Sequence, residues 1–212
     1  MRKKEDLTSG SHIRPDKYLA MPRGLSANLE RTVRESGVTL VLIAGIILFV
    51  LWLSLRPHRP RFHLADFSIP SANRQSGLAN LPVRFAVGEH NPNQKIGIYY
   101  EEIVASVYYG DQLVAKGPVM QPFYQAPKGD TPLLGQLTAT GPTPTDPAWG
   151  RFSGELSAGT VAMRLLLTST VQFQVKMWDT KHHRMKVECD FRMNGDGTLQ
   201  QQDKNSQCAL YF

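Results

Sequence analysis

The hydrophobic and polar positions divide the chain into two parts with different periods. The nineteen residues from Gly37 to Leu55 carry no charge. A helix of that length spans about 28 Å, close to the roughly 30 Å hydrocarbon core of a bilayer. Arg56, Pro57 and Pro60 end the apolar run. The pattern predicts one transmembrane helix over residues 37–55. We interpret it as an uncleaved signal anchor, because no small-residue cleavage site follows it.

From residue 61 onward, apolar and polar residues alternate with the period of a β-strand. The most regular run is Leu81–Val87, and a change of phase near Ala65–Asp66 indicates a β-bulge. Turn-forming residues separate the other alternating runs, which are 62–69, 96–100, 103–109, 113–115, 133–140, 160–180 with an interruption at Ser169, 185–193 and 208–212. Phe152–Leu156 fits either a short helix or an extended segment. Seven to eight strands at this spacing predict an all-β, immunoglobulin/fibronectin-like β-sandwich.

The net charge of +6 is confined to the two flanks of the apolar run. Residues 1–36 carry +3, residues 56–63 carry +3, and residues 64–212 are neutral. A nucleic-acid-binding protein more often carries excess positive charge on its folded domain, so we expect no nucleic acid and a lipid bilayer as partner. The resulting division is a disordered tail (1–36), the helix (37–55), a basic juxtamembrane linker (56–63) and a folded domain (64–212).

The sequence contains no motif typical of catalysis or of metal or cofactor binding. There is no Gly-x-Ser-x-Gly elbow, phosphate-binding loop, dinucleotide fingerprint or His-Glu-x-x-His. Asn194-Gly195-Asp196 begins like a calcium-binding loop, but the residues that follow do not fit one. These three residues are typical of a hairpin turn, and they also resemble the short acidic tripeptides read by adhesion receptors. We therefore expect neither an enzyme nor a cofactor.

The two cysteines, Cys189 and Cys208, share the inward phase of the last two alternating runs. Two interpretations remain open. Buried free thiols fit a domain in a reducing compartment, and a cross-strand disulfide fits a domain on an oxidising side of the membrane.

One sequence motif is more specific than these patterns. Asn91-Pro92-Asn93, followed by Ile98-Tyr99-Tyr100, resembles the plant family of harpin-induced and non-race-specific disease-resistance-like proteins. The folded part of that family is the late-embryogenesis-abundant group 2 domain. Further matches lie in the expected order along residues 37–212: Arg56-Pro57-x-x-Pro60-x-Phe62, Pro122-Phe123-Tyr124-Gln125 and Lys186-Val187-x-Cys189-Asp190.

The resemblance implies a function that the composition does not. It implies an immunoglobulin-like sandwich on a plasma-membrane anchor, no enzymatic activity, and a role in pathogen or stress response. Some members are similar to plasmodesmal contact proteins. Basic residues are equally numerous on both sides of the helix, so charge alone does not orient it. We expect the N-terminus in the cytoplasm and the domain outside.

Two functions remain open at this stage. The first is an interaction protein with unidentified protein partners, in which self-association also fits. The alternative is a lipid-binding or lipid-handling sandwich at a membrane or membrane contact site. An apolar cavity between the sheets would favour lipid binding, and a filled core would favour the interaction protein.

Overall fold

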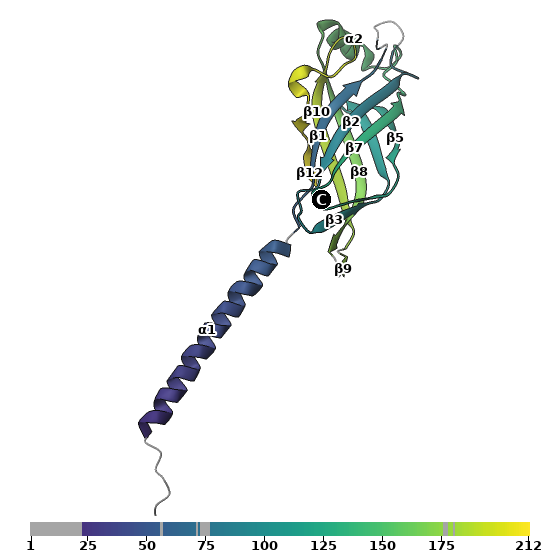
Figure 1. The fold of residues 1–212 in the computed structure, drawn as a ribbon. Coiled ribbons are helices and arrows are strands. Elements are labelled where there is room, and N and C mark those ends of the chain that lie inside the picture. Colours follow the sequence, from purple (N-terminus) through teal and green to yellow (C-terminus); the bar gives the residue numbers. More distant parts are fainter. Residues whose placement is uncertain (1–22, 56, 71, 73–76, 176–177, 180) are drawn as a thin grey trace, which may run out of the picture. The chain divides into compact units, whose positions relative to one another are not determined.

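The computed structural model of the protein describes residues 23–55, 57–70, 72, 77–175, 178–179 and 181–212. The chain divides into two compact units, with the boundary between Ser54 and Leu55. Figure 1 shows helix α1 in the first unit and the strands in the second.

Helix α1 (Arg23–Leu55) contains the predicted apolar segment. Its stretch Arg34–Leu53 has a mean hydropathy of 2.6 and is long and apolar enough to cross a membrane. The helix begins fourteen residues before the expected start at Gly37, so residues 23–36 are helical where a disordered tail was expected. Extending a nucleated helix adds one hydrogen bond for each residue fixed, which favours this continuation. The rest of the expected tail, residues 1–22, lies outside the described residues.

The predicted β-sandwich is confirmed. One sheet has four strands, in the order β11 (Ser206–Gln207), β1 (Arg61–Ser68), β2 (Pro82–His90) and β7 (Asp130–Thr138). The other has eight, whose main path is β12 (Ala209–Tyr211), β10 (His183–Met193), β8 (Val161–Val175), β3 (Ile96–Tyr100) and β6 (Phe123–Gln125). Off this path, β4 (Ile103–Tyr109) pairs with β8 and with β5 (Gln112–Met120), and β9 (Trp178–Asp179) pairs with β8.

The core fills the space between the sheets with the inward-facing residues of each alternating run. Phe62 and Leu64 point inward from β1, and after the bulge between Leu64 and Asp66 so does Phe67. The predicted bulge therefore keeps both halves of β1 in the core. Eight of the strands have five or more residues, in line with the expected number, and the pairing adds four strands of two or three residues.

Several boundaries differ from the expectation, and three of them affect how the fold is built. β8 runs without a break through Ser169, because Leu167 and Val171 on either side of it share one inward phase. The segment around Phe152 is helix α2 (Trp149–Ala158), which buries Trp149, Phe152 and Leu156 against the core. β1 begins at Arg61, and this makes the end of the predicted basic linker part of the folded unit.

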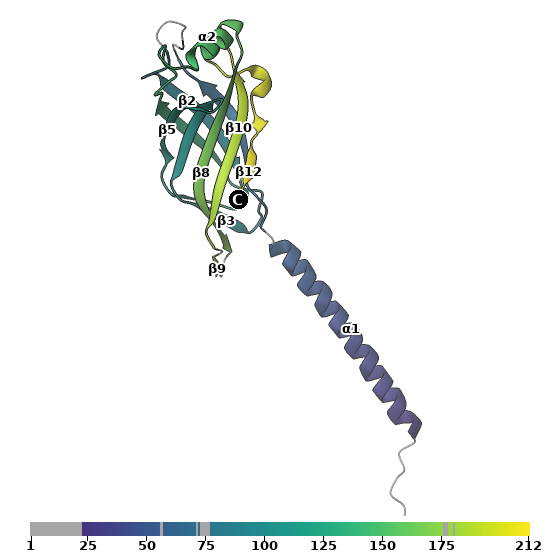
Figure 2. The ribbon, with the colours of Figure 1, turned by 180° about the vertical axis from the view of Figure 1, so that it is seen from behind.

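β8 sets the length of the sandwich and defines its two ends. Its fifteen residues extend over roughly 45 Å. Val161 at one end pairs with Met193 close to α2, and Val175 at the other end pairs with Ile96 at the start of β3. We call these the α2 end and the base. Figure 2 shows the same arrangement from behind, with α2 at one end and β3, β9 and the C-terminus toward the other.

Candidate functional site: the Asn91–Asn93 clamp

The Asn91-Pro92-Asn93 segment follows β2 at the base, where it forms a buried hydrogen-bonding centre. The Asn91 amide nitrogen donates to the carbonyls of Ile96 at 2.9 Å and Ala126 at 3.1 Å. The Asn91 side-chain oxygen accepts from both the backbone and the side-chain nitrogen of Asn93, at 3.0 and 2.8 Å. Asn91 and Asn93 are almost fully buried. Every hydrogen-bonding position of the Asn91 side chain is therefore used.

Asn93 extends this centre to the segment that precedes β1. Its side-chain oxygen accepts from the His58 backbone N–H at 2.7 Å, and its side-chain nitrogen donates to the His58 carbonyl at 2.8 Å. The amide thus bonds to His58 as a neighbouring strand would. We call the bonds of Asn91 and Asn93 to His58, Ile96 and Ala126 the Asn91–Asn93 clamp.

A second contact holds the same segment to the chain's last residue. The Arg59 guanidinium lies 5.6 Å from the centroid of the Phe212 ring, within the range of a cation–π interaction. Phe212 also lies against Phe173 and His183, with ring centroids 6.2 and 6.3 Å away. Residues 56–63 were expected to form a separate linker, of which the structure describes residues 57–63. Instead, the clamp, the Phe212 contact and the start of β1 make them part of the sandwich.

Ile98, Tyr99 and Tyr100 lie on β3, and the two tyrosines face opposite sides of the sheet, as strand geometry requires. Tyr99 is exposed on the outer face, whereas Ile98 and Tyr100 are buried. The Tyr100 ring stacks on Phe123 at 4.9 Å, and its hydroxyl donates to Glu89 at 2.9 Å.

Glu89 is a buried carboxyl group on β2, with an exposed fraction of 1%. Burial raises its pKa from 4.5 to about 7; the hydrogen bond from Tyr100 opposes this rise and the charge of Asp130 adds to it. Thr131, paired with Glu89 across β2 and β7, donates a hydrogen bond to Gln125 on β6. The two sheets are thus joined at the base by two polar side-chain bonds, Tyr100–Glu89 and Thr131–Gln125.

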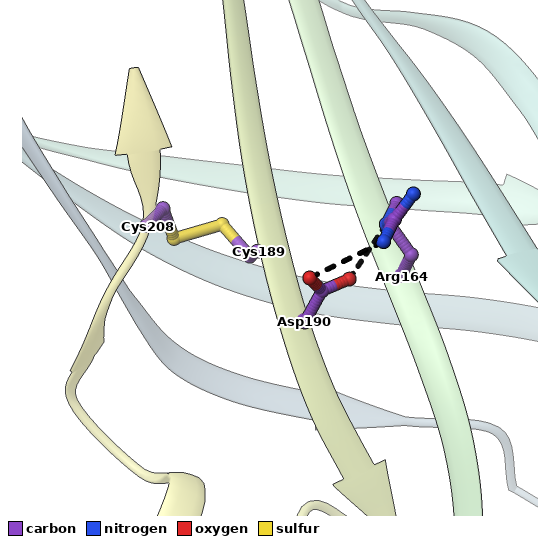
Figure 3. Close-up of a disulfide and its surroundings, with 4 residues drawn as sticks. All are labelled: Arg164, Cys189, Asp190 and Cys208. Atoms are coloured by element: carbon purple, nitrogen blue, oxygen red, sulfur yellow. Dashed lines mark hydrogen bonds and ion pairs between the residues drawn. A yellow bond between two sulfur atoms is a disulfide. The ribbon is translucent and has the colours of Figure 1, made fainter.

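A disulfide joins Cys189 on β10 to Cys208, the residue before β12. The sulfur atoms are 1.99 Å apart and the Cα atoms 4.5 Å apart (Figure 3). Glu188 and Ala209, one step further along, are backbone partners, so the cysteines occupy neighbouring positions on adjacent chains. Figure 3 also shows Arg164 and Asp190 bonded to each other next to the disulfide, at 2.6 and 3.3 Å. This ion pair is exposed, and such pairs add little to stability.

The Asn194-Gly195-Asp196 segment forms a tight turn after β10, at the α2 end and therefore at the opposite end of β8 from the clamp. The Gly197 N–H donates to the Asn194 carbonyl at 3.0 Å. Asp196 is exposed, but its carboxylate accepts from the Thr198 hydroxyl and N–H, and these bonds hold the pKa of Asp196 below its usual value. The structure therefore does not bring this turn together with the other residues singled out in the sequence.

Comparison with known proteins shows what the chain is similar to. Residues 87–189 match the family model described as late embryogenesis abundant protein. The chain is 29% identical over 148 residues to NDR1/HIN1-like protein 26 of Arabidopsis thaliana, covering 68% of this chain and 69% of that protein. It is also 29% identical over 173 residues to Protein NDR1 of the same plant, covering 77% and 76%.

The chain carries a late embryogenesis abundant domain and is similar to NDR1/HIN1-like proteins. The resemblance to the harpin-induced and non-race-specific disease-resistance-like proteins, inferred from the Asn91-Pro92-Asn93 motif, is thereby confirmed. NDR1/HIN1-like protein 3 of Arabidopsis thaliana is 34% identical over a shorter alignment of 99 residues, covering 44% of this chain and 41% of that protein. A solved structure of a protein from Archaeoglobus fulgidus has a TM-score of 0.32 and 12% identity, too distant to carry an argument.

Glu89 is a buried polar residue of this late embryogenesis abundant domain that the sequence pattern did not identify. A signal for Glu89 was present, since it continues the inward series Val83, Phe85 and Val87. An inward carboxyl group in such a series marks either the end of a strand or a buried polar contact. The partner that decides between them, Tyr100, lies eleven residues away on the other sheet.

Proposed function

We propose that this late embryogenesis abundant protein is a single-pass, membrane-anchored interaction protein of plant defence or stress response, without enzymatic activity. One arrangement carries the proposal. A helix of membrane-spanning length ends at Leu55, and three residues later His58 is held by the Asn91–Asn93 clamp. An anchor followed so closely by a rigid domain suits a protein that presents a surface to partners beside a membrane.

The proposed location is the plasma membrane, with the N-terminus in the cytoplasm and the sandwich outside; a position at plasmodesmata is a narrower form of the same proposal. The disulfide between Cys189 and Cys208 supports the outer placement, because such bonds persist on the oxidising side of a membrane. The proposed partners are the bilayer and one or more proteins on the cell-wall side, with self-association a further form of contact. The exposed Asp196 turn is the contact we propose at the α2 end.

The packing between the sheets favours this proposal over a lipid-handling function. Aromatic side chains fill the interior from the base to the α2 end, and each of the following is less than 2% exposed: Phe62, Phe67, Tyr100 and Phe152. The depression on the outer face of the larger sheet, of about 660 Å³, is open and has charged walls that include Glu101, Glu102, Arg184 and Lys186. A lipid tail is better suited to an enclosed apolar cavity.

Two experiments test the proposal. Fluorescent tags on each terminus, with external protease applied to intact cells, should release the C-terminal tag and spare the N-terminal one; release of the N-terminal tag alone would reverse the orientation. In plants that lack the gene, the wild-type chain should restore resistance to a pathogen or stress. A chain with a disrupted anchor should not, and equal rescue by both chains would contradict a role at the membrane.

A further inference from the structure

The base of the sandwich contains an ionisable group in a place where a charge is poorly accommodated. Glu89 accepts one hydrogen bond, from the Tyr100 hydroxyl to Oε1 at 2.9 Å. Its second oxygen, Oε2, has no hydrogen-bond partner among the residues that the structure describes. A buried carboxylate normally needs two or more donors, so the ionised form is under-satisfied here.

The groups around Glu89 do not compensate for a negative charge. Across the strand pairs lie the apolar Phe62 on β1 and the neutral Thr131 on β7. From the opposite sheet, Tyr100 supplies its hydroxyl. The nearby charge is that of Asp130, which is of like sign and already pairs with His90 at 2.8 Å. These surroundings favour the neutral carboxyl, and they agree with a pKa of about 7 for Glu89.

Glu89 lies near the Asn91–Asn93 clamp along β2, and its cross-strand partner Thr131 links it to the clamp through β6. Two residues after Glu89 along β2 comes Asn91, the centre of the clamp. On β6, Gln125 is bonded to Thr131 and directly precedes Ala126, whose carbonyl accepts from the Asn91 side chain. A Cβ placed on Gly129 would lie 3.0 Å from the side-chain nitrogen of Gln125. The Gly129 carbonyl accepts a hydrogen bond from the Asn91 backbone N–H at 3.0 Å.

We propose that the base of the sandwich senses pH: the neutral Glu89 carboxyl keeps the Asn91–Asn93 clamp closed, and its ionisation loosens the clamp and releases His58. The ionised carboxylate gains donors by admitting water. The most direct path for water to the Glu89 carboxylate opens when the 91–95 and 126–129 loops separate. The clamp holds these two loops together. Release of His58 frees the described segment before β1, so the way in which the chain enters the sandwich changes with pH.

The pH sensitivity of the base goes beyond the proposed role in defence or stress, and it holds or fails independently of that role.

The test is hydrogen–deuterium exchange of the full chain in lipid nanodiscs. Exchange is compared at about pH 5.5 and about pH 8 after correction for the intrinsic rate, because at pH 8 a group with a pKa near 7 is roughly tenfold more ionised than neutral.

In the wild-type protein, peptides covering residues 57–60 and 91–96 should exchange several-fold faster at the higher pH, and peptides from the α2 end should not change. Glu89→Gln should remove the difference by keeping them protected at both pH values. Asn93→Ala should remove it by exposing residues 57–60 at both. Equal protection of wild-type residues 57–60 at the two pH values would overturn the proposal, and so would an unchanged pH response in Glu89→Gln.

A second variant keeps the test decisive if Glu89→Gln does not fold. Tyr100→Phe removes the donor to Glu89 and leaves the ring on Phe123. Because that bond lowers the pKa of Glu89, the pH at which residues 57–60 lose protection should move upward. An unchanged midpoint would show that a different group titrates.

Discussion

The side-chain amide of Asn93 bonds to both backbone polar groups of His58, with distances of 2.7 Å to its nitrogen and 2.8 Å to its oxygen. The two residues are 35 positions apart in the sequence, on either side of strands β1 and β2. The Asn91-Pro92-Asn93 segment is therefore more than a turn. It fixes the point at which the chain enters the sandwich, and this structural role does not depend on any partner.

Replacing Asn93 with alanine should free the segment before β1. Asn91 would lose the bond from the Asn93 side chain, and the His58 backbone would lose both of its bonds to Asn93. We therefore expect the free energy of unfolding to fall by about 1–3 kcal/mol. Thermal unfolding of the full chain in detergent measures the loss. The neighbouring Gln94 is exposed, and Gln94→Ala provides the control, with no expected change. Equal melting temperatures of the two variants would contradict the clamp.

The stability of the sandwich should decrease as the pH rises from about 4.5 to about 7. In this window the folded protein retains the Glu89 proton that the unfolded chain has lost, so the free energy of unfolding falls with pH and levels off above it. The full effect is roughly 3 kcal/mol. Urea unfolding across this range should show the slope in the wild type, and a flat profile would contradict it. The slope should be absent in Glu89→Gln. It should be smaller in Asp130→Asn, because the charge of Asp130 adds to the rise in the pKa of Glu89.

How far the sequence predicts this structure depends on whether the deciding contact is local. Alternation alone placed Phe62, Phe67 and Phe85 in the core, and the change of phase located the bulge in β1. The polar contacts at the base were not predictable in the same way, because Asn93 and His58 meet only after two strands have folded between them. Ser169 interrupts the apolar series and therefore predicted a break, yet β10 pairs continuously with β8 from Val161 to Val171, and this pairing carries the strand through Ser169.

Reduction of the disulfide should loosen the C-terminal strand. Cys189 and Cys208 are 19 residues apart, and the chain-entropy model gives roughly 3 kcal/mol for a loop of about that size. For a domain of about 150 residues, this corresponds to a fall in melting temperature of roughly 6–12 °C. Chain isolated from membranes in the presence of an alkylating agent should show no free thiol. Full alkylation of both cysteines without reductant would contradict both the bond and the outward placement that it supports.

The anchor should fail when charge is placed in the middle of α1. Ile46 and Leu48 lie within the apolar stretch and are exposed in the structure, as side chains that face lipid would be. Replacing both with arginine costs roughly 2.5–3.5 kcal/mol for each residue on insertion scales. We expect the double variant to be extracted from membranes by alkaline carbonate and the conservative variant Ile46→Leu, Leu48→Ile to remain. Retention of the arginine variant would contradict a spanning helix.

Phe85 and Gly135 form a pair whose energetic coupling can be measured. They are directly opposite each other on β2 and β7, and a Cβ placed on Gly135 would lie only 2.1 Å from Cζ of Phe85. The ring thus covers the glycine, and both the aromatic residue and the missing side chain are needed. Phe85 is 4% exposed, so Phe85→Ala should cost about 3–5 kcal/mol.

Gly135→Ala should then have opposite effects in two backgrounds. In the wild type it forces the Phe85 ring to move, at a cost of about 1–3 kcal/mol. In the Phe85→Ala background the ring is absent, so the added methyl group occupies part of the space that it left. Alanine also restricts the unfolded chain. In this background Gly135→Ala should therefore raise the free energy of unfolding by about 0.5–1 kcal/mol. A double-mutant cycle on the full chain in detergent, followed by thermal unfolding, measures this coupling. Additive effects of the two substitutions would show that the ring and the glycine are not in contact, and that the register of β2 against β7 is different.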